Sequence, residues 1–231
     1  MIHGSAADRT TWSIQLAGPL REKFELTAYD RGELPSVEAY AAEAATRIGD
    51  SRALVVGSSF GAVVALELLR TQPQLCAGAI LIEPPMAPTD APPTDPVAFL
   101  RDFDLIVSEQ GGPAAGEFFL RTVLGDAAFE RIPKAFRDRS AAKWAAIRAD
   151  SQALIEYRPR YAELATVTTP VLLLGGDRSA PYFRPTLDAL ARVLPSAKLE
   201  IVSGAGHMLH AEAPRRFAEL LIAFAAEIQI G

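Results

Sequence analysis

A buried strand runs into a Gly-x-Ser-x-Gly sequence and then into a helical pattern, and this junction constrains the fold more than any other feature of the chain. The apolar residues 53–56 precede Gly57-Ser58-Ser59-Phe60-Gly61, and an Ala- and Leu-rich helix is predicted over 62–69. Such a turn is strained, and the two glycines remove side chains that would clash, so the serine hydroxyl projects above the sheet edge. The positive end of the helix dipole points at it. This context makes Ser59 a candidate nucleophile, whereas the motif alone would describe only a glycine-bounded turn with a solvated serine.

Strands and helices alternate along the remainder of the chain. The pattern of residues 24–29 predicts a strand, and Ser36 begins a helix that Gly49 ends. Further segments follow the same rhythm, with strands at 53–57, 79–83, 171–174 and 199–202, and helices at 182–194 and 214–228. This order predicts an α/β fold with a mostly parallel sheet and helices on both of its faces.

One long segment interrupts the alternation. Glu83-Pro84-Pro85 and Pro92-Pro93 open it, and helices are predicted within it at 97–108, 114–123 and 141–154. We therefore expect an α/β core made of residues 1–86 and 170–231, and a helical cap inserted at 87–169. Most aromatic side chains of the insertion should form its own core and some should line an apolar pocket; they are Phe99, Phe103, Phe118, Phe119, Phe129, Phe136, Trp144 and Tyr157.

Composition narrows the classes of partner. The net charge of -5 and the absence of a Lys/Arg run argue against nucleic acid or an anionic membrane and favour a small molecule. Cys76 is the only cysteine, which excludes an intramolecular disulfide, and the histidines lack zinc-site spacing, so neither a metal nor a cofactor is expected. No signal-peptide pattern or membrane-length apolar run is present, which predicts a cytoplasmic protein, and no pattern bears on the oligomeric state.

A general base for Ser59 is predicted at the end of the last strand. Ser203-Gly204-Ala205-Gly206-His207 follows that strand directly, and a flexible Gly-rich loop can carry an imidazole over the sheet edge to a serine hydroxyl. His210 is the alternative, but only His207 closes the Gly-x-Gly-His loop. We therefore predict His207 as the base and expect His210 to face the following loop or helix.

An oxyanion hole requires two backbone donors, one after the nucleophile and one from an N-terminal loop. Phe60 supplies the first amide. Met1-Ile2-His3-Gly4-Ser5 has the pattern of a strand end followed by a tight loop, which makes the amide of Ser5 the second candidate. We expect His3 to orient this loop rather than to act as a base.

Taken together, these pieces resemble the α/β-hydrolase superfamily, and they occur in the order found in that family. They are His3-Gly4-Ser5, Tyr29-Asp30-Arg31-Gly32, Gly57-Ser58-Ser59-Phe60-Gly61, Leu172-Leu173-Leu174-Gly175-Gly176-Asp177 and Gly204-Ala205-Gly206-His207. The resemblance spans nearly the whole chain. One departure is that only Met1 and Ile2 precede the His-Gly loop, so either the sheet is shorter at that edge or the true start lies upstream.

The second departure concerns the acid that supports the histidine. The family's usual position corresponds to Ser179, and Asp177 lies two residues earlier. A subset of α/β hydrolases is similar to this chain in combining a Glu-Pro-Pro segment with a Ser-x-Pro loop, and placing the acid on the earlier strand is a family variation. Because parallel strands end at one edge, Glu83 can approach the imidazole there. We therefore assign the acid to Glu83, with Asp177 as the alternative.

The residues and the resemblance predict a serine hydrolase for a carboxylic ester or a similar acyl substrate, with catalytic residues Ser59, His207 and Glu83. The oxyanion hole is assigned to Ser5 and Phe60. Two alternatives use the same fold: carbon–carbon bond hydrolysis of a dienoate-like substrate, and a non-hydrolytic cyclase-like or binding scaffold. Dehalogenase and epoxide hydrolase chemistries are disfavoured because they need a carboxylate where this chain has Ser59.

Overall fold

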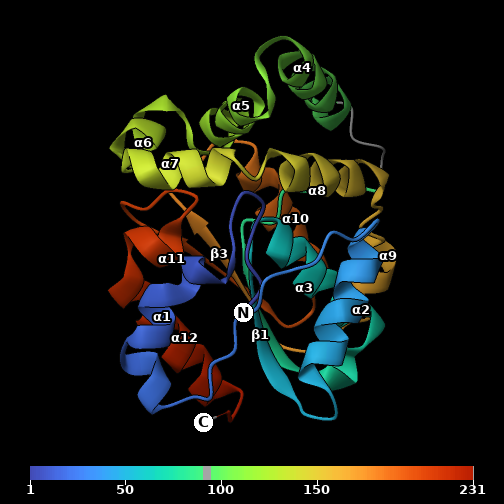
Figure 1. Ribbon diagram of the computed structural model, residues 1–231. Coiled ribbons are helices and arrows are strands. Elements are labelled where there is room, and N and C mark those ends of the chain that lie inside the picture. The colour runs from blue at the N-terminus through green and yellow to red at the C-terminus, as the bar shows by residue number, and fades with distance from the viewer. Residues whose placement is uncertain (91–94, 231) are drawn as a thin grey trace.

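A four-stranded parallel sheet forms the centre of the computed structural model, which describes residues 1–90 and 95–230 (Figure 1). Its strands lie in the order β1-β2-β3-β4, namely β1 (Ala53–Ser58), β2 (Cys76–Ile82), β3 (Val171–Gly176) and β4 (Ala197–Val202). Each neighbouring pair is parallel. The α/β fold predicted from the alternation of strands and helices is confirmed.

Side chains alternate between the two faces of the sheet, and each face has its own helices. Val55, Leu81 and Leu173 pack on the face covered by α2 (Val37–Ile48), α3 (Phe60–Thr71) and α10 (Phe183–Val193). Their neighbours Val56 and Leu172 pack on the opposite face, against α12 (Pro214–Glu227) and the N-terminal helices. This two-residue period follows from strand geometry. A strand in which every residue is apolar therefore contributes side chains to the apolar clusters on both faces of the sheet.

Local signals explain where several helices begin and end. The hydroxyl of Ser36 accepts a hydrogen bond from the Ala39 amide at 3.2 Å, which caps α2, and Gly49 ends this helix with a φ of 65°. In α10 the buried residues Phe183, Leu187 and Leu190 recur at helical spacing on one side. These boundaries agree with those expected from the sequence.

Helices α4–α8 form a separate layer over one end of the sheet (Figure 1). They are α4 (Asp95–Gln110), α5 (Gly112–Leu124), α6 (Asp126–Arg131), α7 (Lys134–Ala141) and α8 (Trp144–Glu156). We call them the cap. They enclose an apolar cluster of their own, built on Phe103, Phe129 and Ile147. Farther along the chain, Tyr157 and Leu164, the latter in α9 (Tyr161–Leu164), pack instead into the cluster on the α2 and α3 face.

The predicted strand at 24–29 is wrong, because this segment is irregular in the structure. A strand requires a continuous ladder of hydrogen bonds. The Met1 amino group donates to the Thr27 carbonyl at 2.7 Å, and next to β1 the described chain offers an isolated bridge between Ile2 and Gly57 in place of a further strand. The sheet is thus short at this edge, and no regular neighbour is available to the segment.

The sequence prediction also missed several short helices in the described part of the chain. They are η1 (Arg9–Trp12), α1 (Ser13–Ala17), η2 (Pro19–Glu22), η3 (Pro73–Leu75), α6, α7, α9 and α11 (Leu209–Glu212). Pro92-Pro93 lies outside the described residues. None of the helices in residues 1–90 and 95–230 has both the length and the hydropathy needed to cross a bilayer.

Candidate active site

Ser59 occupies a strained turn between β1 and α3. Its φ of 54° and ψ of -124° lie outside the ordinary regions for a residue with a side chain. A Cβ atom on Gly57 would lie 2.2 Å from the Gly61 carbonyl oxygen, and one on Gly61 would lie 2.3 Å from the Ile2 oxygen, so both motif positions require glycine. The Ser59 amide donates to Ile82 at 2.8 Å, which fixes the turn to β2.

Sheet register brings Glu83 to the same edge as Ser59. Ser58 and Ile82 are direct partners across β1 and β2, so the residues that follow them leave the sheet side by side. Glu83 is buried, has a φ of 45°, and accepts a hydrogen bond from the Gly176 amide at 2.8 Å through Oε1. The carboxylate is therefore held in place by the end of β3.

The second oxygen of Glu83 contacts His207. Glu83 Oε2 lies 2.6 Å from His207 Nδ1, and both side chains are buried. An ionised carboxylate only accepts hydrogen bonds, so Nδ1 carries the proton and Nε2 is left as an acceptor. The imidazole also stacks on Phe183, with ring centroids 4.3 Å apart and planes 10° from parallel. Position and tautomer of His207 are both set by its surroundings.

Asp177, the alternative acid, has a different set of partners. It accepts hydrogen bonds from the Ser203 hydroxyl at 2.9 Å and the Gly204 amide at 2.8 Å. Its exposed carboxylate thus ties the end of β3 to the loop that carries His207. Ser179, at the family's usual position, has a buried hydroxyl without a hydrogen-bond partner in the described part of the chain.

Ser59 and His207 line one cavity of about 790 Å³ between the sheet edge and the cap. Gly4 and Ser5 contribute to its wall from the N-terminal loop, and Phe119 contributes from the cap. A Cβ atom on Gly4 would lie 2.9 Å from Ser59 Cβ, so the loop passes directly against the candidate nucleophile. No Ser59–His207 hydrogen bond occurs within the described residues, and such contacts often tighten only when substrate is bound.

Of the two predicted oxyanion donors, Ser5 lines the cavity, and Phe60 directly follows Ser59, which also lines it. Phe60 is the first residue of α3, where amides have no acceptor within the helix. The hydroxyl of Ser5 donates to Asp150 Oδ2 at 2.7 Å, which orients the residue. No backbone carbonyl of residues 1–90 or 95–230 accepts the Ser5 amide. Neither amide is thus bound to a backbone carbonyl in the described part of the chain.

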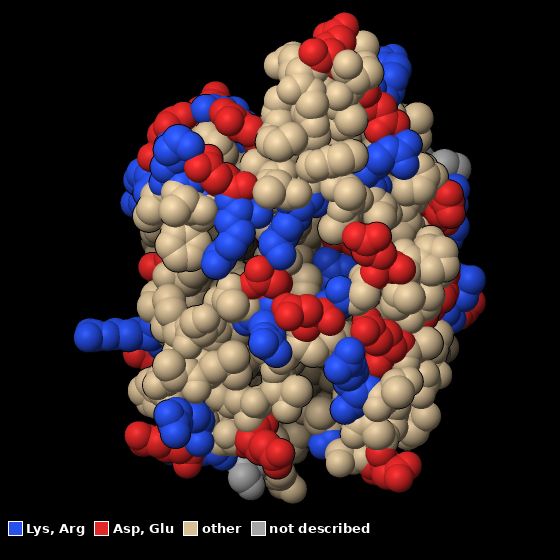
Figure 2. Space-filling model, in the orientation of Figure 1, with Lys and Arg blue, Asp and Glu red and all other residues tan. Residues whose placement is uncertain are grey.

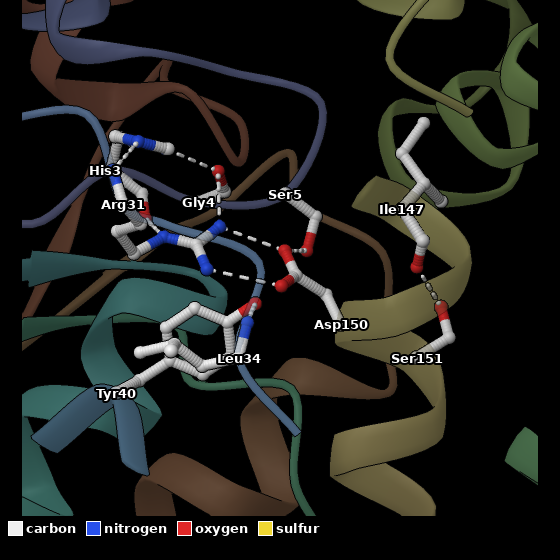
Figure 3. Close-up of polar contacts among 9 residues, drawn as sticks. All are labelled: His3, Gly4, Ser5, Arg31, Leu34, Tyr40, Ile147, Asp150 and Ser151. Carbon is white, nitrogen blue, oxygen red and sulfur yellow. Dashed lines mark hydrogen bonds and ion pairs between the residues drawn. The ribbon is translucent and has the colours of Figure 1, made fainter. Parts of the chain in front are cut away.

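His3 orients the N-terminal loop, as its sequence context suggests (Figure 3). Its Nε2 accepts a hydrogen bond from the Arg31 amide at 3.2 Å, and its Nδ1 lies 2.8 Å from the Gly4 oxygen. Burial, reinforced by the charge of Arg31, lowers the pKa of His3 to about 4, so the ring is neutral at pH 7. A neutral ring with the proton on Nδ1 satisfies both contacts.

A buried ion pair joins this loop to the cap (Figure 3). The Arg31 guanidinium donates to both oxygens of Asp150, at 3.0 and 2.7 Å, and the two side chains are 5% and 2% exposed. Arg31 also donates to the His3 oxygen at 3.2 Å and the Gly4 oxygen at 3.3 Å. Asp150 belongs to α8 of the cap, and its carboxylate accepts hydrogen bonds from both the Ser5 hydroxyl and Arg31. Arg31 in turn binds two carbonyl oxygens of the N-terminal loop. Sequence reasoning did not identify Asp150.

His210 is buried at the wall of the same cavity, but the Glu83 carboxylate pairs with His207 instead. Its ring packs on Trp12 with centroids 4.5 Å apart, and Nε2 lies 3.3 Å from the Thr11 hydroxyl. Burial, followed by the charge of His207, lowers the pKa of His210 to about 3. These contacts favour a packing role. In the described part of the chain, no group of three His, Cys, Asp or Glu side chains could hold a metal ion.

Comparison with known proteins extends these observations to the whole chain. The family model described as the alpha/beta hydrolase family matches residues 1–220. No curated protein matches the chain. Among solved structures, the chain is similar to a thermophilic esterase from Thermogutta terrifontis with malate bound, at 23% identity and a TM-score of 0.79, covering 98% of this chain and 88% of that one.

Two further structures have similar folds. MenH from S. aureus has 17% identity and a TM-score of 0.78, covering 99% of this chain and 92% of that one. The carboxylesterase CesB from Bacillus subtilis has 19% identity and a TM-score of 0.72, covering 96% and 81%. At these identities the likeness concerns the fold.

Proposed function

Because the chain belongs to the alpha/beta hydrolase family, we propose that it is a serine hydrolase that cleaves a carboxylic ester or a similar acyl substrate through an acyl-enzyme on Ser59. The 2.6 Å contact between Glu83 and His207, at the cavity lined by Ser59, is the observation that carries the proposal. Esterases among the structural neighbours add support at the level of fold.

The proposed reaction uses Ser59 and His207, which line the cavity, together with Glu83 and two backbone amides. His207 Nε2 takes the proton from Ser59 Oγ as that oxygen forms a bond to the acyl carbon, and the Phe60 and Ser5 amides bind the resulting oxyanion. The alkoxide leaves with the proton from His207. Water then attacks the acyl-enzyme and gives a proton to His207, which returns it to Ser59 Oγ as the bond to the acyl group breaks and the acid is released. Throughout, Glu83 stabilises the imidazolium.

A fluorophosphonate probe tests the proposal without knowledge of the substrate. It should form a covalent adduct on Ser59, detected as a mass increase on the peptide containing residues 53–70. Absence of labelling, in protein with a native circular dichroism spectrum, would favour the non-hydrolytic scaffold. Labelling without turnover of any ester would direct attention to the carbon–carbon bond hydrolase, which uses the same residues.

Cap variants should change acyl-chain preference. Phe119 lines the cavity, whereas its neighbour Phe118 stacks on Phe99 inside the cap with centroids 5.3 Å apart. We expect Phe119→Ala to change the ratio of kcat/KM for octanoyl and acetyl p-nitrophenyl esters by about tenfold, because only the longer acyl group reaches this side chain. Phe118→Ala, the matched control, should lower Tm and leave the ratio unchanged. Equal changes for both esters in Phe119→Ala would contradict a specificity role.

Trp144, which we also considered as a specificity residue from its position in the insertion, lies elsewhere. Its indole packs against Gly112, where an added Cβ would come within 2.2 Å of the ring. It therefore fixes the approach of α5 and α8 and does not line the cavity that contains Ser59.

Asp150 is proposed as a positioning residue for the oxyanion loop. Asp150→Asn leaves Arg31 without its counterion and weakens the acceptor of the Ser5 hydroxyl, so the loop should lose its fixed position. Since oxyanion donors act in the transition state, we expect kcat for an acetyl ester to fall by roughly 10²-fold while KM changes little. Steady-state kinetics below the unfolding temperature measure this split.

Asp104→Asn provides the control for Asp150→Asn. Asp104 of α4 accepts two hydrogen bonds, of 2.7 and 2.8 Å, from Arg148, which lies on α8 as Asp150 does. This ion pair is partly exposed, and its hydrogen bonds do not involve the N-terminal loop. The control should lower Tm slightly and keep kcat. If the two variants lost kcat to the same extent, Asp150 would act through cap stability alone.

A further inference from the structure

Basic side chains from the cap line the cavity that contains Ser59. They are Arg131 at the end of α6, Arg139 on α7, and Lys143 just before α8. Figure 2 shows Lys and Arg side chains along the boundary between the cap and the core on this face of the molecule. The whole chain has a net charge of -5, so this gathering of positive charge is a local feature.

Ion pairing distinguishes the cavity arginines from other basic residues of the cap. Arg121, Lys134 and Arg137 do not line the cavity, and each has an acidic partner, in Glu130 or Asp138. Arg131 and Arg139 have no acidic partner among the described residues. Their charges are thus available to a ligand.

The acidic residues of the cavity are already occupied. Asp8 pairs with Lys143 at 3.0 Å and accepts a hydrogen bond from the Thr10 amide. Glu212 accepts hydrogen bonds from the Gly206 and Met208 amides, at 3.0 and 3.3 Å, and so holds the loop around His207. Neither carboxylate is directed to the cavity arginines, which therefore leave the cap side of the cavity cationic.

Apolar side chains of the cap line the same cavity as these basic residues. Arg139 lies over the ring of Phe136, 4.9 Å from its centroid, and Phe136 itself lines the cavity. The remaining cap residues of the wall are mostly apolar, and they are Phe119, Leu120, Val123, Leu124 and Ile132. An apolar chain with an anionic end matches this combination of apolar and cationic side chains better than a neutral ester does.

We propose that Arg131 and Arg139 select substrates that carry a carboxylate at the end remote from the scissile ester, such as the hemiester of a dicarboxylic acid. A guanidinium can bind a carboxylate through two parallel hydrogen bonds. The inference rests on the proposed function for the reaction, but it concerns the binding of the anion, which is measurable without turnover.

Monomethyl adipate and dimethyl adipate test the proposal, because they share the acyl chain and differ in the charge of the far end. We expect kcat/KM to be higher for the monoanion by about tenfold, and this preference to shrink as salt is added. The double variant Arg131→Gln/Arg139→Gln should lose most of the preference by losing activity on the monoanion only. Lys134→Gln/Arg137→Gln, a double variant on α7 outside the cavity lining and with the same change in net charge, should retain it.

A binding arm separates the inference from the proposed function. Calorimetry with Ser59→Ala should detect adipate binding that is at least about fivefold tighter than hexanoate binding, and the added double arginine substitution should abolish the difference. That result would support the inference even if no ester were hydrolysed. Equal binding of adipate and hexanoate, or an undiminished preference in the double arginine variant, would overturn it whether or not Ser59 is catalytic.

Discussion

Replacing Ser59 by alanine should abolish the hydrolysis of short p-nitrophenyl esters and leave the fold intact. Ser59 is the residue that forms the turn between β1 and α3. The strained backbone directs its side chain out of the turn, and the positive end of the helix dipole lies beside it. The expected loss in kcat is on the order of 10³-fold or more, and binding together with the oxyanion donors should leave some background. Initial rates, compared with circular dichroism of the same samples, measure the effect.

Ser58→Ala is the matched control for this experiment. Ser58 precedes the nucleophile, is buried, and belongs to β1, with its amide bound to the Ile2 carbonyl at 3.1 Å. We expect this variant to keep the fluorophosphonate label, which Ser59→Ala should lose. Near wild-type turnover in folded Ser59→Ala would eliminate Ser59 as the nucleophile and with it the proposed mechanism.

Local chemistry explains which parts of the site were predictable from sequence. The turn at Ser59 can be recognised from two glycines, because a Cβ atom at either position would collide with the backbone. The histidine loop can be recognised from the glycines that precede His207. Glu83 could be placed because strand ends in a parallel sheet share one edge, and the register of Ser58 with Ile82 provides that neighbourhood. Each of these features depends on a few consecutive residues and on a general property of sheets.

Long-range pairing explains what remained hidden. Asp150 lies 119 positions from Arg31, and a single aspartate within a helix carries no sign of such a partner. The strand predicted at 24–29 was wrong for a related reason. Alternation of side chains is compatible with a strand, but it does not show whether a neighbouring strand is present to form the backbone hydrogen bonds. The helices between residues 9 and 22 are too short to produce a recognisable helical period of apolar residues in the sequence.

The cap illustrates the same distinction. Helical periodicity indicates that this segment has buried faces, and most of its aromatic residues form the expected apolar cluster, whereas Tyr157 packs on the core and Phe136 is exposed. Periodicity does not tell which neighbour faces the cavity, because Phe118 and Phe119 differ by only 100° around the same helix. Packing between α5 and α8 resolves it, since it takes Trp144 into the cap and leaves Phe119 at the cavity wall.

Glu83→Gln should lower kcat on one ester at neutral pH by about 10³- to 10⁴-fold, the scale expected when the acid of a catalytic triad becomes its amide. The substitution keeps the shape of the side chain, and the amide oxygen can still accept from the Gly176 amide. The remaining NH₂ group would then face His207 Nδ1 as a donor, which favours the tautomer with the proton on Nε2. That tautomer cannot accept a proton from Ser59, so the loss should appear in kcat while the fold persists.

Asp177→Asn is the comparison that decides between the two acids. Its carboxylate binds Ser203 and Gly204 and has no contact with His207, so the amide should cost only about tenfold, through a weaker loop anchor and a smaller negative field. A large loss for Asp177→Asn beside a small one for Glu83→Gln would reverse the assignment. Large losses for both would mean that His207 is oriented by a network containing both carboxylates, in which the anchor at Gly204 matters as much as the 2.6 Å contact with Glu83.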